Sequence, residues 1–468
     1  MDRGISPTVR EGSAIPCPQY EPSLTVGLMP RSGNTTLGGI LALLVKLLGL
    51  SLNFASHALK LLTMIPVDEA ISIVLRRSTQ PQFESVALGE ASGRILAEDI
   101  VADSDLPPFD RAQMDGYAVR ATDVAKVPAH LRIVGESAAG AGWHNEMKAG
   151  EAVRIMTGAP VPSGADAVQQ VELTGELNGG GIVEIREVVE AGRSIVSQAA
   201  EIKAGETVLH AGEDINAAMI ATLASFGYAQ VKVGRKPRVA VMATGSELVD
   251  IDQKPARDQI RDSNNYTIAA YAALAGATVE RLPLAGDDTE ELKRQIADAA
   301  RRSDVLITSG GVSMGVYDFT KAALKELGAE IFFERVALRP GKPTVFARLG
   351  DTLVFGLPGN PVSVAVTFNL FVRTALRAMQ GAKEPALKEE TAVLARTVKG
   401  SIERESYLPA VLRMDEKGTL LAEPLKWGGS SDFVAFARAT ALVNVPTGTK
   451  TIEANQLVRV MRLPGSIR

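Results

Sequence analysis

Residues 238–378 alternate short aliphatic runs with segments whose apolar residues recur at helical spacing. The runs Arg238–Ala243 and Val305–Ile307 are apolar almost throughout, which is typical of strands buried on both faces. The pattern predicts strands over 238–243, 279–284, 305–307, 330–336 and 352–356, and helices over 265–275, 290–301, 318–327 and 361–378. Because strands alternate with helices, we expect a mostly parallel sheet covered on both faces, that is, a three-layer α/β domain.

The regions on either side have different patterns. Helical periodicity is present over 67–76 and 214–226, but Pro107-Pro108 interrupts the chain between them. Residues 108–190 are rich in glycine and in short β-branched runs, which predicts a small β-rich domain. Residues 381–468 contain short apolar runs separated by glycine turns, which is consistent with a small C-terminal β-barrel.

The first 63 residues differ from the rest of the chain. Proline, glycine, serine and threonine are frequent up to Thr36, and only Leu37–Leu50 is apolar, with Lys46 as its one charge. These 14 residues are too few to cross a bilayer core of roughly 30 Å, but they suffice for a signal-type apolar region or an amphipathic helix. We expect residues 1–63 to be a disordered or nonessential leader, so that the chain cut back to Met64 folds and functions. The alternative is a targeting or membrane-surface role.

The composition is that of an ordinary globular protein. The 468 residues correspond to about three domains, and 46% of them are hydrophobic and 22% charged. A net charge of −4 argues against nucleic acid as a partner. A single cysteine, Cys17, excludes a disulfide framework within the chain and a thiolate metal site. The four histidines lack metal-ligand spacing: His57, His130, His144 and His210.

The sequence TSGGVSMG at 308–315 directly follows the aliphatic run Val305–Ile307. Paired glycines allow a tight turn in which backbone N–H groups and hydroxyls point into one concavity, and such a turn before a helix suits phosphate oxygens. In parallel sheets, ligands bind beyond the carboxyl ends of the strands. The loop therefore predicts a site for an anionic ligand.

Charged residues follow the same set of predicted strands. The carboxylates of Glu247, Asp287 and Asp318 lie in loops after strands, and the cations Arg339 and Lys342 each directly precede a proline. Each loop alone is more often a helix cap or a surface turn. Carboxylates, cations and a glycine loop at one sheet edge can together hold a divalent metal and a phosphorylated ligand.

Two further loops have an ordinary structural explanation. Asp262-Ser263-Asn264 precedes a predicted helix and can cap it. LPGNP at 357–361 is a rigid turn that caps the following helix and carries a free amide side chain. For both loops, a purely structural role is as plausible as a functional one.

Six short motifs occur in order along the chain. They are PPFDRAQMDGYAVR at 107–120, RIMTGAPVP at 154–162, TGSEL at 244–248, SGGVSMG at 309–315, RPGKP at 339–343 and LPGNP at 357–361. One motif alone is weak evidence, but six in register are very specific. The set resembles the molybdopterin molybdenumtransferase family, called MoeA in bacteria, with relatives in the plant Cnx1 and animal gephyrin E domains. The resemblance covers about residues 65–463.

The resemblance implies an L-shaped homodimer of four-domain subunits. The family inserts molybdate into adenylylated molybdopterin, releases AMP and forms molybdenum cofactor, with Mg²⁺ assisting. We therefore expect a cytoplasmic enzyme without membrane or nucleic-acid partners, which can contact molybdopterin adenylyltransferase and molybdoenzymes. The implied domains are an elongated linking domain (64–105 and 191–237), the small β-rich domain (106–190), the α/β molybdopterin-binding domain (238–380) and the β-barrel domain (381–468).

The resemblance also implies the residues of the active cleft, carried over position by position. Asp115 and Thr157 are expected to reach the cleft of the other subunit. The implied catalytic residues are Asp115, Thr157, Glu247, Asp287, Asp318 and Lys342. The implied substrate-binding residues are Ser309, Gly310, Gly311, Ser313, Arg339, Lys342, Pro358 and Asn360. The implied metal ligands are Glu247, Asp287, Asp318 and Glu201.

One segment departs from the family pattern. Where the family has basic residues followed by Gly-Glu-Asp, this chain reads VSQAAE at 196–201 and keeps only the carboxylate of Glu201. The loss of positive charge predicts weaker attraction for an oxyanion. Three hypotheses follow: the molybdenum insertase, a noncatalytic or specificity-shifted paralogue that binds molybdopterin, and a molybdopterin adenylyltransferase. The third shares the α/β domain but is typically a single domain.

Overall fold

The computed structural model describes residues 64–78, 80–285, 288–311 and 319–465 of the chain. Three of the implied site residues, Asp287, Ser313 and Asp318, lie outside these ranges, as does the leader 1–63. The expectations for them therefore stay predictions.

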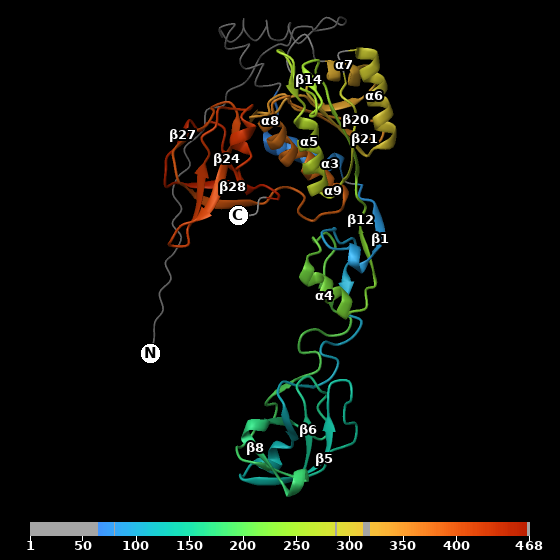
Figure 1. The fold of residues 1–468 in the computed structure, drawn as a ribbon, viewed down its shortest axis with the longest axis vertical. Coiled ribbons are helices and arrows are strands. Elements are labelled where there is room, and N and C mark those ends of the chain that lie inside the picture. Colours follow the sequence, from blue (N-terminus) through green and yellow to red (C-terminus); the bar gives the residue numbers. More distant parts are fainter. Residues whose placement is uncertain (1–63, 79, 286–287, 312–318, 466–468) are drawn as a thin grey trace, which may run out of the picture. The chain divides into compact units, whose positions relative to one another are not determined.

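The α/β domain is built on a six-stranded sheet with the order β16-β13-β17-β21-β20-β18. Figure 1 labels β20 and β21 of this sheet together with helices of the same domain. β16, β13, β17 and β21 pair in parallel, whereas β20 is antiparallel to both of its neighbours. The predicted mostly parallel sheet is thus confirmed. Its strands are β13 (Arg238–Ala243), β16 (Thr278–Arg281), β17 (Val305–Ser309), β18 (Glu330–Phe333), β20 (Val345–Leu349) and β21 (Thr352–Leu357).

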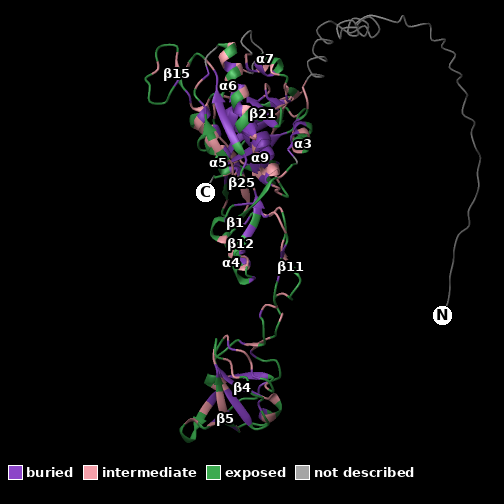
Figure 2. Ribbon diagram, turned by 90° about the vertical axis from the view of Figure 1, so that its right-hand side faces the viewer, coloured by how far each residue is buried: buried purple, intermediate pink, exposed green. Residues whose placement is uncertain are grey.

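Both faces of this sheet are buried, which explains the continuous aliphatic runs in the sequence. In β13, Val239 and Val241 belong to one apolar cluster, and Ala240 and Met242 belong to another on the opposite face. The helices α6 (Thr289–Arg302) and α7 (Phe319–Glu326) contribute to the second cluster. In Figure 2, α6 has an exposed side, whereas β21 is buried.

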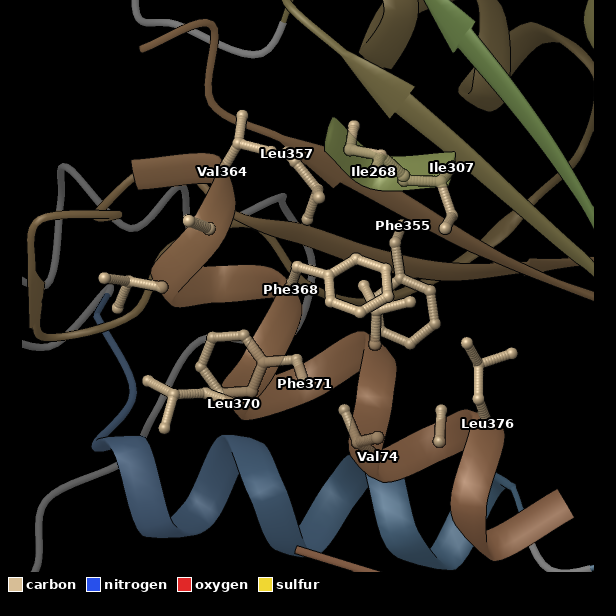
Figure 3. Close-up of a cluster of buried hydrophobic side chains, with 14 of the residues drawn as sticks. Val74, Ile268, Ile307, Phe355, Leu357, Val364, Phe368, Leu370, Phe371 and Leu376 are labelled. Carbon is tan, nitrogen blue, oxygen red and sulfur yellow. The ribbon is translucent and has the colours of Figure 1, made fainter. Parts of the chain in front are cut away.

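Five α-helices of the described chain contribute to the first cluster: α3 (Val67–Arg77), α5 (Asn264–Leu274), α8 (Pro361–Thr367), α9 (Arg373–Met379) and α10 (Phe433–Phe436). Figure 3 shows Phe355 of β21 in this cluster with Phe368 and Phe371, and Val74 of α3 also belongs to it.

The predicted helix over 361–378 is observed as α8 and α9 joined by a π-helical turn at Phe368–Val372. Pro361–Met379 is long and apolar enough to cross a membrane, but 83% of its most apolar window is buried in the protein. Such burial is expected of a core helix.

The small domain is a second six-stranded sheet with the order β7-β4-β6-β5-β9-β8, which confirms the predicted β-rich fold. Its two faces carry separate apolar clusters, one around Tyr117 and Val183 and the other around Val153 and Ile155. The strands are β4 (Gly116–Val119), β5 (Ala129–Ser137), β6 (Glu151–Ile155), β7 (Ala167–Gln170), β8 (Thr174–Leu177) and β9 (Ile182–Ile185).

Three antiparallel strand pairs join the segments on either side of the small-domain sheet in the sequence. Helix α4 (Ala217–Ser225) packs through Leu223 with two of these pairs, whereas Ala112 of the third pair belongs to an apolar cluster of the small domain. The side-chain oxygen of Asn216 caps α4 by accepting a hydrogen bond from the Met219 backbone N–H. The pairs are β1 (Phe83–Ala87) with β12 (Gln230–Gly234), β2 (Ile100–Val101) with β11 (Thr207–Leu209), and β3 (Arg111–Ala112) with β10 (Ile195–Val196).

The C-terminal strands close into a barrel, as predicted. β24 pairs with β25 and β26, β22 pairs with β25 and β28, and β28 pairs with β26, so five strands complete a ring. A short strand of the α/β domain, β19 (Leu338–Arg339), adds to β24 in parallel. The barrel strands are β22 (Glu389–Leu394), β24 (Glu405–Met414), β25 (Leu420–Pro424), β26 (Ala441–Val445) and β28 (Leu457–Arg462).

Candidate functional site

Three loops meet at one edge of the parallel sheet. The strands β13, β17 and β21 end in register, with Ala243 opposite Ser309 and Ser309 opposite Leu357. The loops that follow these strands therefore leave the sheet side by side. This is the edge at which ligands bind in parallel α/β sheets.

Two glycines allow the loop after β17 to turn tightly. Gly310 and Gly311 have φ angles of +90° and +62°, which are strained for residues with a side chain. A Cβ atom on Gly310 would lie 2.4 Å from the carbonyl oxygen of Thr244, and one on Gly311 would lie 2.5 Å from Oγ1 of Thr320. Only glycine fits at these positions, so the loop packs directly against the neighbouring loop and the start of α7.

Side-chain amides connect the loops to one another. Nδ2 of Asn264 donates to Oγ of Ser309 at 2.8 Å and to the carbonyl oxygen of Gly359 at 2.7 Å. Nδ2 of Asn360 donates to Oγ of Ser430, in the C-terminal domain, at 2.8 Å. The glycine loop, the LPGNP turn and the C-terminal domain are therefore held in one hydrogen-bonded series.

Glu247 lies exposed on the loop after β13. A Cβ atom on Gly245 would lie 2.4 Å from Oε2 of Glu247, so the glycine lets the carboxylate fold back over its own loop. After this loop, β14 (Leu248–Val249) pairs in parallel with β15 (Ile260–Arg261). The pairing fixes the loop from which the carboxylate projects.

A cavity of about 770 Å³ lies between the α/β domain and the C-terminal domain. The α/β domain contributes Arg339, Pro358 and Asn360 to its lining, and Ser430 lies on the opposite wall. Among the described residues that line it, five have cationic side chains and none has a carboxylate; the cations are Arg339, Arg396, Lys399, Arg404 and Lys426. We call this the cationic cavity.

Two of these cations are partly neutralised or held in place by other groups. Arg396 forms an ion pair with Glu423 at 3.1 Å, and Nη1 of Arg339 donates to the Gly400 carbonyl oxygen at 3.3 Å. Within the ranges that the structure describes, Lys399, Arg404 and Lys426 have no acidic partner within 4.0 Å. The cavity therefore keeps an excess of positive charge, which attracts multiply charged oxyanions.

Lys342 belongs to the same RPGKP segment as Arg339, but it is not itself a lining residue of the cavity. Its neighbours Gly341 and Pro343 are lining residues, and Lys342 itself is half-buried. Its carbonyl oxygen accepts hydrogen bonds from the backbone N–H groups of Val336 and Thr344, each at 3.0 Å. The backbone of this second cation is thus fixed beside the first.

Asp115 and Thr157 form an exposed pair on the surface of the small domain, where Asp115 follows β3 and Thr157 follows β6, and we call this pair the tip. Both the backbone N–H and the hydroxyl of Thr157 donate to Oδ1 of Asp115, at 2.7 and 2.8 Å. The backbone hydrogen bond from Thr157, with the hydroxyl bond next, lowers the pKa of the Asp115 carboxyl. Both residues are exposed, and the carboxylate stays charged to a lower pH than an ordinary aspartate.

Glu201 lies in the linking region and faces a cation. Its nearest charged partner in the described residues is Arg111, at 3.9 Å. The segment before it is held by the Gln198 side chain, which donates to Asp105 at 2.8 Å, and by the Gln198 backbone N–H, which donates to Asp110 at 2.8 Å. These contacts join the segment to the chain at Asp105 and Asp110, as expected of residues with a structural role.

The structure brings the implied residues into separate groups. One group at the sheet edge comprises Glu247, Ser309, Gly310, Gly311, Arg339, Lys342, Pro358 and Asn360. The pair Asp115 and Thr157 and the residue Glu201 have no hydrogen bond or ion pair to this group in the described part of the chain. Nor do the described residues contain a group of three or more histidine, cysteine, aspartate or glutamate side chains that could hold a metal. The metal ligands implied by the sequence stay a prediction, since Asp287 and Asp318 lie outside those ranges.

Sequence reasoning missed the C-terminal half of the cationic cavity. Arg396, Lys399 and Arg404 lie within nine residues in a domain for which the sequence indicated only short strands and turns. A clustering of basic residues between two strands was the available signal. What it lacked was the pairing of β19 with β24, which places this cluster beside Arg339.

Comparison with known proteins covers nearly all of the described chain. Three family models match: the MoeA N-terminal region (domain I and II) at residues 65–227, the probable molybdopterin binding domain at 240–378, and the MoeA C-terminal region (domain IV) at 391–463.

Full-length relatives agree with these matches. Molybdopterin molybdenumtransferase of Bacillus subtilis is 38% identical over 405 residues, which cover 85% of this chain and 94% of the relative. The protein of the same name from Haemophilus influenzae is 34% identical, with 85% and 98% covered. The crystal structure of the molybdopterin biosynthesis moeA protein from Pyrococcus horikoshii superimposes with a TM-score of 0.74 at 27% identity, covering 86% of this chain and all of that one. From its domains, its motifs and its similarity over the whole length of these relatives, the chain belongs to the molybdopterin molybdenumtransferase (MoeA) family.

Proposed function

We propose that this protein inserts molybdate into adenylylated molybdopterin, with release of AMP, in the synthesis of molybdenum cofactor. The observation that carries the proposal is the cationic cavity, which opens beside the glycine-loop edge of the molybdopterin-binding domain and shares Pro358 and Asn360 with it. The names of the relatives support the same reaction.

The charge of the cavity suits molybdate, a dianion. Arg404 and Arg339 offer planar guanidinium groups that can donate paired hydrogen bonds to oxyanion oxygens, and Lys399 and Lys426 add point charges. None of the described lining residues is a carboxylate that would oppose them. These cations would bind the oxyanion and neutralise its charge.

The sheet edge would hold the phosphate end of the second substrate. The glycine loop, whose turn at Gly310 and Gly311 requires glycine, would offer backbone N–H groups to an anion, and Lys342, whose backbone is held nearby, would supply a cation. Because no side-chain nucleophile is required, the contribution of the protein is to orient the two substrates and to neutralise their charge.

Mg²⁺ fits the implied carboxylate set. Glu247, Asp287 and Asp318 offer the oxygen ligands that this ion prefers, and Glu247 is exposed at the sheet edge. When bound, Mg²⁺ would neutralise phosphate charge. Glu201 is the weaker member of the implied set, because its neighbour is Arg111.

The Asp115–Thr157 pair is proposed to act in the cleft of a second copy of the chain. The pair is exposed, pre-formed and ionised, and it is flanked by exposed apolar side chains, with Met114 at 42% and Met156 at 36% exposure. An apolar rim around a fixed carboxylate is suited to a protein contact. We also propose a cytoplasmic location and transient contacts with the adenylyltransferase before it and with molybdoenzymes after it.

The test is release of AMP by the purified full-length chain. With adenylylated molybdopterin and Mg²⁺, we expect AMP to appear only when molybdate is added, and sulfate at the same concentration to give none. Tight binding of the adenylylated ligand without molybdate-dependent release would instead favour a noncatalytic molybdopterin-binding paralogue. Formation of the adenylylated ligand from ATP and molybdopterin would favour an adenylyltransferase.

A further inference from the structure

Asn264 is the first residue of α5, but its side chain does not cap that helix. The capping hydrogen bond at this helix start comes from Asp262, whose Oδ1 accepts from the Asn265 backbone N–H at 3.0 Å, and Ser263 makes no side-chain cap. The Asn264 amide instead donates to Ser309 and to Gly359. The helix-capping hydrogen bond predicted for Asp262-Ser263-Asn264 is therefore made by Asp262, and Asn264 takes no part in it.

The orientation of the Asn264 amide is fixed by its partners. The carbonyl oxygen of Gly359 can only accept, so the group that faces it must be the NH₂ of the amide. Among the described residues, the amide oxygen, Oδ1, then has no hydrogen-bond partner although it is buried. A buried unpaired oxygen is unfavourable by about 1–3 kcal/mol, so this arrangement is not the one that helix stability alone would select.

Asn264 is the centre of a series of contacts that joins the two halves of the site. We call Ser309, Asn264, Gly359, Asn360 and Ser430 the loop strap. Within it, Asn264 ties the glycine loop to the LPGNP turn, and Asn360 ties that turn to Ser430 on the wall of the cationic cavity.

Two backbone hydrogen bonds lie at the two ends of the strap, where their opening can be measured. The Gly310 N–H donates to the Leu357 carbonyl oxygen at 3.2 Å, and the Val362 N–H donates to the Ser430 carbonyl oxygen at 3.0 Å. If Asn264 holds the strap together, both bonds should open more often when its amide is lost.

We propose that Asn264 is a positioning residue that sets the separation between the glycine loop and the cationic cavity. The inference rests on the proposed function, in which these two places hold the phosphate and the molybdate. Binding of each substrate depends on its own half of the site. Reaction between them depends on their separation, and a misplacement of about 1 Å can slow a reaction roughly 100-fold.

The test compares Asn264→Ala and Asn264→Asp with Asn265→Ala in the full-length protein. Aspartate keeps the shape of Asn264 but cannot donate. The control residue Asn265 is a buried neighbour whose Nδ2 donates to the Leu282 carbonyl oxygen at 3.3 Å, away from the strap. For each variant, four quantities are measured: the rate of amide hydrogen exchange, the melting temperature, the molybdate concentration at half-saturation and the rate of AMP release at saturation.

Both Asn264 variants should exchange the Gly310 and Val362 amides about tenfold faster, and Asn265→Ala should not. At saturation, AMP release should fall about 10- to 100-fold in the Asn264 variants, with molybdate half-saturation changed less than about threefold. Asn265→Ala should lower the melting temperature and leave the rate within about twofold.

Equal effects of the Asn264 and Asn265 substitutions on exchange and rate would overturn the proposal, because the role would then be stability alone. Weaker molybdate binding with an unchanged saturated rate would also overturn it. The comparison of hydrogen-exchange rates does not require that the protein be catalytically active. If the wild type released no AMP, the proposed function would fail while the strap would still be judged by exchange.

Discussion

The sheet edge and the tip of the small domain are the two places where implied site residues gather, and they are organised differently. At the sheet edge, Asn264, Ser309 and Asn360 join loops from one domain and connect them to the next. At the tip, Asp115 and Thr157 contact each other and have no hydrogen bond to the sheet edge in the described chain. The implied residues of the sheet edge are therefore joined to one another within the chain, whereas the tip belongs to a domain with its own core.

The two places also differ in charge. The cationic cavity has five positive lining side chains, and the tip carries an ionised carboxylate. Opposite charges guide two surfaces toward each other and fix their register. The comparison thus suggests that the tip of one copy completes the sheet edge of another.

The largest effect is expected from Arg404→Ala, which removes a cavity cation without an acidic partner in the described residues. A charge-assisted hydrogen bond contributes about 1.5–3 kcal/mol, so half-saturating molybdate should rise roughly 10- to 100-fold. Arg459→Ala is the matched control, since Arg459 is exposed on the same barrel and pairs with Glu389. The measurement is the rate of AMP release as a function of molybdate concentration for each variant. If Arg404→Ala and Arg459→Ala gave the same half-saturating molybdate, the cavity would not be the binding site of the anion.

At the tip, Asp115→Asn should lower turnover about tenfold without changing half-saturating molybdate, because the charge is lost but an oxygen still accepts from Thr157. Asp115→Ala should lower turnover further, because it removes both hydrogen bonds between the Asp115 side chain and Thr157. Glu187→Gln, at an exposed acid of the same domain, should have no effect. A rise in half-saturating molybdate for Asp115→Asn would place the tip in anion binding rather than in turnover.

The ionisation of Asp115 can be followed directly by carboxyl NMR. Its pKa is lowered first by the Thr157 backbone N–H and then by the hydroxyl. The stabilisation from these bonds is therefore complete above the ordinary carboxyl pKa and is lost as the pH falls through the lowered one. Thr157→Val should raise the pKa only part of the way, because the backbone bond remains. A full return to the ordinary value would mean that the hydroxyl is the main cause.

The smallest effect is expected in the segment 196–201, which connects the two halves. Ala199 has a φ of +58°, a conformation that suits glycine, whereas Ala200 is not in the left-handed region. Ala199→Gly should therefore stabilise the protein by about 0.5–1 kcal/mol and Ala200→Gly should destabilise it by a similar amount. Chemical denaturation of both variants checks the prediction, and a loss of stability in Ala199→Gly would contradict it.

Much of the fold follows from sequence because both faces of the sheet are buried. The runs at β13 and β17 predict central parallel strands, and the glycines at 310 and 311 predict the tight loop after β17. Strand β20 was missed, since Val345–Leu349 has no helix between it and β21 and follows a proline-rich turn.

The cationic cavity could not be predicted in the same way. Arg339 and Arg404 are distant in sequence, and only the parallel pairing of β19 with β24 brings their segments together. Local patterns predict elements and loops, but register between domains depends on packing that no single segment encodes.

The central claim, that the tip of one copy completes the sheet edge of another, is tested most directly by mixing two impaired variants. Asp115→Ala damages the tip and Lys342→Ala damages the sheet edge, so a mixed dimer has one site with both halves intact. Equal amounts, unfolded and refolded together, should recover about a quarter of the wild-type AMP release, because half of the dimers are mixed and each has one intact site. No recovery above that of the separate variants, with mixed dimers shown to form, would contradict the account.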